Sequence, residues 1–177
     1  YSTRRTDYFP TELQFLLSDC LFDGRPDPQI AQHEAYGSWF GSELSDFHEP
    51  SLSRRANSAP RSIRFLWLRS FHEPIVVRID DLADGGKQLT AKRRSAGAGF
   101  NASDRSHGAT EQVRRLGADE VERFEAVYRA TAPMDLPDAG CSCCLDGAQW
   151  IVEVSDPERG YRYRRHQSPQ SGPEREL

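Results

Sequence analysis

Hydrophobic and polar positions alternate most regularly in residues 62–94. Apolar side chains occupy both parities of residues 63–71, which predicts a central strand that is covered on its two faces. Residues 75–80 alternate more cleanly, as expected for a strand with one buried and one solvent-facing side. A third, more polar strand is predicted at residues 89–92. The Asp84-Gly85 pair before it tolerates positive φ angles and predicts a tight hairpin turn.

Two segments carry apolar residues at helical spacing. Residues 11–23 begin with a capping box, and residues 118–132 begin with acidic side chains, which the N-terminus of a helix favours. Another helix is predicted to start at Asp27-Pro28. Residues 48–61 are rich in Ser, Arg and Pro and are predicted to form a connector. Residues 95–117 contain several glycines and small polar residues, which predicts a loop.

Two further strands are predicted at residues 150–154 and 161–166. Together these elements predict an α+β fold, in which an antiparallel sheet of about five strands has helices packed on one face. Residues 1–60 would form an N-terminal helical segment and connector, and residues 61–177 would form the sheet domain. The chain length suits a single compact unit with its own core.

Composition excludes some classes of partner. The 177 residues carry a formal net charge of −4 at pH 7, which gives no bulk attraction to nucleic acid. In residues 161–166 tyrosines interleave with arginines, and we interpret this as an outer strand with Tyr161 and Tyr163 packed inward rather than a base-stacking platform. Arg64 and Arg93 are interpreted as part of a solvated strand face. No run of residues is long and apolar enough for a transmembrane segment.

The cysteines suggest a disulfide more than a metal site. Cys141, Cys143 and Cys144 place three thiols close together, and such a group could hold Zn²⁺ or Cu⁺. Their spacing is unlike that of zinc ligand pairs, so we expect no metal or other cofactor. Cys20 lies on the apolar stripe of the first predicted helix and is expected to form a disulfide with one of the three. Pairing between neighbours within the cluster is the alternative.

The histidines give no catalytic constellation. His72 and His107 are the candidates for a hydrolase-type enzyme. His72 precedes Glu73, but adjacent residues of a strand point to opposite faces, so the two cannot easily act together. Ser103 and Ser106 lie near His107, and neither occupies a Gly-x-Ser-x-Gly nucleophile turn. We therefore assign no catalytic residue and expect a protein without enzymatic activity.

Several sequence blocks resemble a group of uncharacterised bacterial proteins, many of which are predicted to be exported or lipid-anchored. The blocks are RFLWLRSFH at 64–72, PIVVR at 74–78, GAGF at 97–100, LDGAQWIVE at 145–153 and SP at 168–169. Residues 164–167 and the dense cysteine cluster depart from the pattern of that group. The resemblance implies an α+β fold and export, and it implies no activity.

The strand pattern and the missing catalytic constellation favour a binding or structural domain. An unknown protein or small-molecule partner would contact the sheet face or residues 95–117, and the alternatives are the hydrolase and the thiolate metal site. The resemblance implies a periplasmic or extracellular location, or attachment through a removed N-terminal segment. The chain begins at Tyr1 rather than Met, as in a processed or trimmed protein. Trp67, Trp150 and Phe124 lie on apolar stripes and are expected to be buried in one core.

Overall fold

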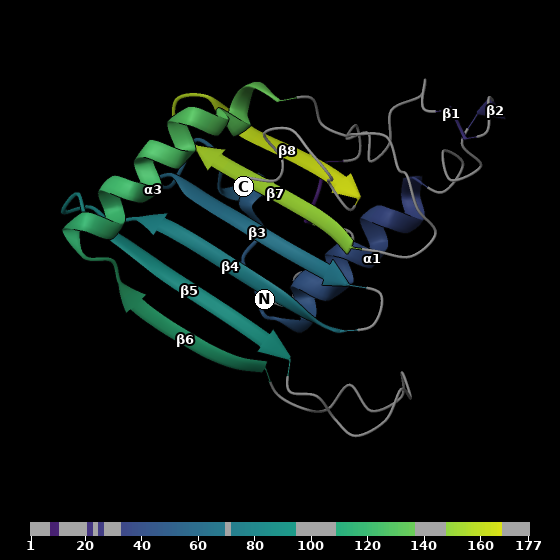
Figure 1. Ribbon diagram of the computed structural model, residues 1–177, viewed down its shortest axis with the longest axis horizontal. Helices are drawn as coiled ribbons and strands as arrows, with labels where there is room; N and C mark the ends of the chain where they lie inside the picture. The colour runs from purple at the N-terminus through teal and green to yellow at the C-terminus, as the bar shows by residue number, and fades with distance from the viewer. Residues whose placement is uncertain are drawn as a thin grey trace.

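The computed structural model describes residues 8–10, 21–22, 25–26, 33–69, 72–94, 109–136 and 148–167. Its main element is an antiparallel sheet of six strands in the order β6-β5-β4-β3-β7-β8 (Figure 1). In chain order the strands are β3 (Ser62–Arg69), β4 (His72–Asp81), β5 (Lys87–Arg94), β6 (Ala109–Arg115), β7 (Ala148–Asp156) and β8 (Gly160–Gln167). β3 therefore lies inside the sheet, between its hairpin neighbour β4 and the much later strand β7.

The sheet contains one strand that the sequence does not predict. β6 lies within residues 95–117, for which a loop is predicted, and it forms the edge of the sheet beside β5. All seven of its residues are exposed. A strand that buries neither face needs no apolar alternation, so the period-2 signal that identifies the other strands is missing here. The sheet therefore has six strands rather than the predicted number of about five.

The N-terminal segment also differs from the prediction. Leu21–Phe22 forms strand β1, which pairs with β2 (Arg25–Pro26), whereas the sequence predicts a helix that continues to residue 23. The remainder of that predicted helix lies outside the described residues. The structure then describes helix α1 (His33–Asp46), and the predicted connector at 48–61 contains the short helix α2 (Leu52–Arg55).

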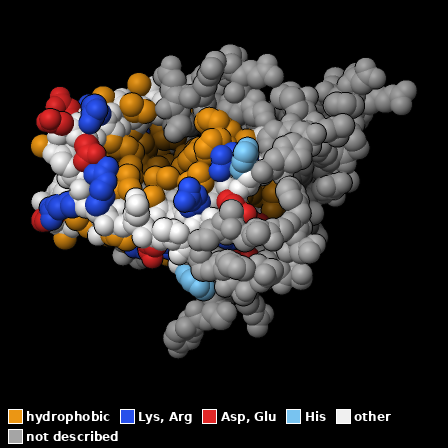
Figure 2. Space-filling model, turned by 60° about the horizontal axis from the view of Figure 1, so that its bottom comes forward, with side chains coloured by type: hydrophobic (Ala, Val, Ile, Leu, Met, Phe, Trp, Pro, Cys, Tyr) orange, Lys and Arg blue, Asp and Glu red, His pale blue; other side chains and the backbone are white. Residues whose placement is uncertain are grey.

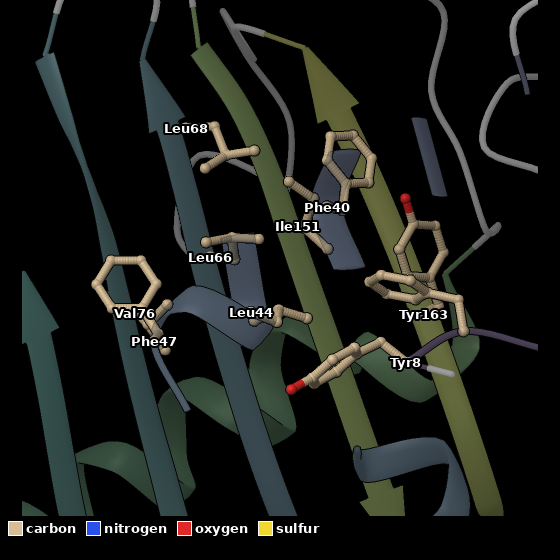
Figure 3. Packing of buried hydrophobic residues seen from close by; sticks show 10 residues of the cluster. Tyr8, Phe40, Leu44, Phe47, Leu66, Leu68, Val76, Ile151 and Tyr163 are labelled. Atoms are coloured by element: carbon tan, nitrogen blue, oxygen red, sulfur yellow. The ribbon is translucent and has the colours of Figure 1, made fainter. Parts of the chain in front are cut away.

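The main hydrophobic core lies between one face of the sheet, helix α1 and the N-terminal residues Tyr8 and Phe9 (Figure 3). Its buried members are Tyr8, Phe9, Phe40, Leu44, Phe47, Leu66, Leu68, Val76, Ile151 and Tyr163. Leu66 and Leu68 share one parity of β3 and therefore point to the same face. The segment before residue 61 thus shares a core with the sheet. The inward position of Tyr163 agrees with the prediction for the last strand.

Helix α3 (Ala118–Thr131) crosses the opposite face at one end of the sheet and is followed by the short helix η3 (Pro133–Asp135) (Figure 1). Its side chains face Ile63 and Phe65, which have the other parity of β3. The expectation that the helices pack on one face is therefore not confirmed, although an antiparallel sheet with helices is what an α+β fold requires. Every helix in the described part of the chain falls short of the length and apolar character that crossing a membrane needs.

Candidate functional site: an apolar groove on the sheet

An apolar groove opens between α3 and the sheet face that α3 crosses (Figure 2). From the sheet, its lining residues are Ile63, Phe65, Val77, Ile79 and Val152. From the helix side, they are Phe124, Val127, Tyr128, Thr131 and Pro133. The groove has a volume of about 300 Å³, which lies at the lower end of the range for small-molecule sites. Its lining suits an apolar molecule, and Lys, Arg and His side chains are visible near its border in Figure 2.

The groove exists because this face of the sheet is only partly covered. Ile63, Phe65 and Trp67 alternate along β3 with the core residues Leu66 and Leu68. The two leucines are buried, whereas the other three side chains remain partly accessible. The groove residue Val127 on α3 is 46% exposed. Contiguous apolar side chains that stay accessible on one face often mark an interaction site.

Ion pairs hold α3 against the sheet and so fix one wall of the groove. Arg61, directly before β3, binds Asp81 at 3.1 Å and also binds Glu125 of α3. Lys87 of β5 binds the same Glu125 with an Nζ to Oε1 distance of 2.6 Å. The Arg61 guanidinium also lies over the Tyr128 ring, with Cζ 4.7 Å from the ring centroid. Asp81, Lys87 and Glu125 belong to β4, β5 and α3, respectively. Because these contacts join α3 to two strands, they limit how far α3 can shift along the sheet.

A second ionic contact lies at the start of α3 and leads to a testable prediction. Arg114 of β6 donates to both carboxylate oxygens of Glu120, at 2.8 and 2.7 Å, and the Gly117 backbone N–H donates to the same carboxylate at 2.9 Å. The Arg114 hydrogen bonds, followed by the one from Gly117, lower the pKa of Glu120 to about 2. We expect the substitution Arg114→Ala to return this pKa toward its ordinary value of 4.5.

The measurement is a ¹³C NMR titration of the Glu120 carboxyl group. Because the folded-state pKa lies below the ordinary value, the pair stabilises the fold at neutral pH and this stabilisation is lost as pH falls from 4.5 toward 2. Arg123→Ala is the control, since Arg123 makes the smallest contribution to the lowered pKa. Equal titration curves for wild type and Arg114→Ala would show that this contact does not form in solution.

A row of aromatic rings continues the groove along β3 and β7. The Phe65 ring centroid lies 5.5 Å from that of Trp150, and the Trp67 centroid lies 5.9 Å from Trp150, both with edge-to-face geometry. At the end of the row, the Arg69 guanidinium lies over the Trp67 ring with Cζ 4.4 Å from the centroid. Trp67, Trp150 and Phe124 are all only partly buried, so the prediction that they are buried in one core is wrong. They lie on the less covered face of the sheet.

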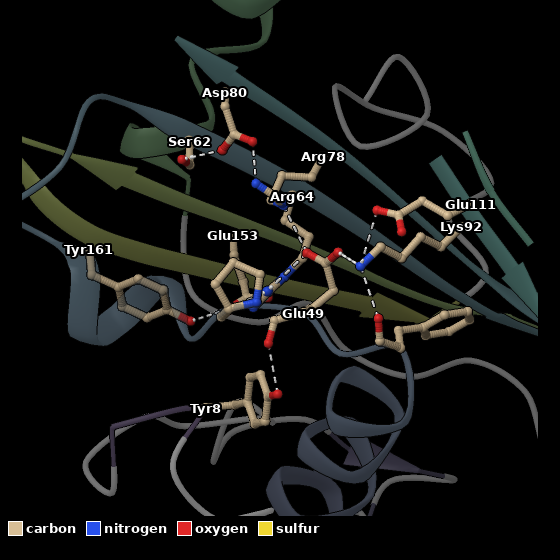
Figure 4. A network of polar contacts seen from close by, with 12 residues as sticks. Tyr8, Glu49, Ser62, Arg64, Arg78, Asp80, Lys92, Glu111, Glu153 and Tyr161 are labelled. Carbon is tan, nitrogen blue, oxygen red and sulfur yellow. Dashed lines mark hydrogen bonds and ion pairs between the residues drawn. The ribbon is translucent and has the colours of Figure 1, made fainter. Parts of the chain in front are cut away.

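On the opposite face, charged side chains form a buried network around Arg64 (Figure 4). Arg64 Nε and Nη2 lie 2.7 and 2.6 Å from Oε2 of Glu153, and Nη1 lies 3.5 Å from Oε2 of Glu49. Glu49 also binds Arg78 Nε and Lys92 Nζ, each at 2.9 Å. The side chains of Arg64, Glu49 and Glu153 are 0% exposed. The interpretation of Arg64 as part of a solvated face is therefore wrong.

The electrostatics of this network indicate a structural role. Burial opposes the charge on Arg64, but Glu153 and Glu49 outweigh it and raise the Arg64 pKa. Burial raises the pKa of Glu153 against the opposing effects of Arg64 and Tyr161, whose hydroxyl donates to Glu153 Oε1 at 2.8 Å. A carboxyl with a raised pKa can mark a catalytic acid. Here both carboxylate oxygens already have partners and the side chain is enclosed, so no substrate can reach it.

The candidates from the sequence do not come together in the described structure. His72 is exposed at the first position of β4, away from any ion pair with a described carboxylate. His107, Cys20, Cys141, Cys143 and Cys144 lie outside the described residues, so the disulfide, the hydrolase and the thiolate site stay predictions. Within the described ranges, no group of three or more His, Cys, Asp or Glu side chains could hold a metal ion.

Sequence reasoning missed the buried charges, although one signal was present. Arg64 shares the parity of Leu66 and Leu68 in β3, and Glu153 shares the parity of Ile151 in β7. A charged residue on the same face as fully apolar neighbours is a candidate for a buried ion pair. That Arg64 lies directly opposite Glu153 follows only from the strand register.

Comparison with known proteins adds no identification. The chain matches no model of a protein family, and it matches none of the curated protein sequences. The resemblance to exported bacterial proteins therefore stays a prediction.

Proposed function

We propose that this protein is a non-enzymatic binding domain whose groove takes a small molecule with an apolar body. The observation that carries the proposal is the hollow of about 300 Å³ with its apolar lining. Removing apolar surface from water supplies about 25 cal/mol per Å², so an apolar ligand needs few polar contacts to bind. A protein partner would cover about 800 Å² on each side, whereas a hollow of this volume fits one small molecule.

The polar groups of the lining support binding rather than catalysis. The Thr131 hydroxyl donates to the backbone carbonyl of Val127 at 3.0 Å, so its proton is already used within α3. Burial raises the pKa of Tyr128 and outweighs the effect of Arg61, which keeps the phenol neutral and weakly acidic. Neither hydroxyl is paired with a described general base. The lining thus offers orientation and apolar contact.

The test uses 1-decanol, an uncharged probe, and follows the fluorescence of the tryptophans beside the groove during titration. We expect saturable binding by the wild-type chain. Val127→Asp places a charge at a groove position that is 46% exposed, so it should leave the fold intact. We expect it to weaken binding at least about tenfold, because an unpaired charge loses its hydration when the ligand covers it.

Ala126→Asp is the matched control, because Ala126 is the exposed neighbour on α3 and is not part of the groove lining. It adds the same charge to the same helix and should leave the affinity unchanged. Absence of saturable binding to the wild type, or an equal loss in both variants, would overturn the proposal.

The proposal also places the protein in the periplasm or outside the cell. The sequence resemblance supports this location, and the four cysteines suit an oxidising compartment. Recovery of the protein in the cytosolic fraction of its native cells would contradict it.

A further inference from the structure

The end of the aromatic row carries a cation that has no charged partner among the described residues. Arg69 Nη2 donates to the backbone carbonyl of Glu73 at 2.9 Å, and the guanidinium stacks on Trp67. By contrast, Arg64 and Arg78 of the sheet and Arg61 directly before β3 each bind at least one carboxylate. Arg69 of β3 binds no carboxylate of the described residues. It lies at the end of the strand that forms the groove floor. No carboxylate of the described residues therefore balances its charge.

Two buried N–H groups at this place also have no acceptor within the described part of the chain. Arg69 Nε and Trp67 Nε1 are buried atoms, and neither has a hydrogen-bond partner among the described residues. Leaving such a donor unpaired destabilises the folded state, so native structures rarely do so. The two donors belong to stacked side chains on one strand, and both side chains are partly exposed. A single group with two acceptor atoms that displaced the atoms covering these N–H groups could satisfy both.

These donors are continuous with the groove. The rings of Phe65, Trp150 and Trp67 form the contacts that lead from the groove lining to Arg69. Four residue steps along the extended strand lead from Phe65 to Arg69, roughly 13 Å, which is comparable to an extended chain of about ten carbons. An apolar surface that ends at one unpaired cation is complementary to a molecule with an apolar body and one acidic head group.

We propose that Arg69 and Trp67 bind the carboxylate of an amphiphile, such as a medium-chain fatty acid, whose hydrocarbon body lies along the aromatic row and in the groove. This inference rests on the proposed function, because it names the class of ligand for the same groove. A carboxylate supplies two acceptor oxygens for the two unpaired donors and one negative charge for one cation. Binding occurs with no covalent step.

The experiment compares decanoate with 1-decanol, which differ only in the head group, by calorimetric titration of the full chain at pH 7.5. We expect wild type to bind decanoate about tenfold to a hundredfold more tightly than 1-decanol, because a hydrogen bond to a charged group is stronger than one to a neutral group. Arg69→Gln should weaken decanoate binding far more than 1-decanol binding and so remove most of this preference. Trp67→Phe keeps an aromatic ring but removes the N–H, so it should reduce the preference in part.

Arg129→Gln is the matched control, since Arg129 is an exposed arginine on α3 outside the groove lining, and it should keep the full preference. Equal affinity of wild type for the two probes would overturn the carboxylate inference and leave the proposed function standing. Absence of binding to both probes would overturn the proposed function itself. A loss of 1-decanol affinity in Arg69→Gln, together with a lower unfolding midpoint, would assign Arg69 a structural role and would also overturn the inference.

Discussion

Replacing Arg64 by alanine is expected to lower the free energy of unfolding by about 3–5 kcal/mol, or to prevent folding altogether. Arg64 is fully buried between Glu153 and Glu49, and it also donates to the backbone carbonyl of Pro50 at 2.6 Å. Its removal leaves these carboxylates in the protein interior with fewer cations and donors. The measurement is urea unfolding of the purified chain, followed by circular dichroism.

Two substitutions in β8, the strand beyond β7, make the test specific. Tyr161→Phe removes only the hydroxyl that donates to Glu153 and should cost about 1–2 kcal/mol. Arg162→Ala removes an exposed arginine from β8 and should leave the unfolding curve nearly unchanged. If Arg64→Ala unfolded at the same urea concentration as the wild type, the network drawn in Figure 4 would not be buried in solution.

The second large effect is expected from Leu66→Ala, which should also cost about 3–5 kcal/mol. Leu66 is 0% exposed and lies in the main core under α1. Its neighbour Phe65 points to the groove and is only partly buried. We therefore expect Phe65→Ala to cost only about 1–2 kcal/mol, although it removes the larger side chain.

Comparing these adjacent positions controls for the strand and for its backbone pairing. Urea unfolding of both variants under the same conditions gives the order of the two effects directly. A larger loss for Phe65→Ala would mean that the face crossed by α3 holds the main core, and the groove would then be closed in solution.

Local patterns predict much of this fold because local backbone preferences create those patterns. The alternation in residues 62–94 predicts β3, β4 and β5, and the Asp84-Gly85 turn between the last two is present with Gly85 at a φ of 81°. The apolar spacing and acidic first turn of residues 118–132 predict α3. Each of these signals lies within one element. β6 has no such signal, because it buries neither face.

The candidate site was less predictable for a physical reason. Both parities of β3 are apolar, so the sequence indicates a strand that is covered on two faces. It does not indicate which face is more deeply buried. Residues distant in the chain decide this, because α1 and Tyr8 cover the Leu66 side, whereas α3 covers only one end of the other side. The large aromatic Trp67 therefore lies in a partly open row rather than in the main core.

The sequence by itself thus determined β3, β4, β5, β7, β8 and α3, since their period-2 and period-3.6 patterns arise within single segments. Only the tertiary structure decided which face became the core, which charges became buried, and where an apolar surface stayed open. Arg64 meets Glu153, 89 positions away, through the register of β3 and β7. Burial and pairing depend on such distant neighbours, because a side chain loses its contact with water only when another part of the chain covers it.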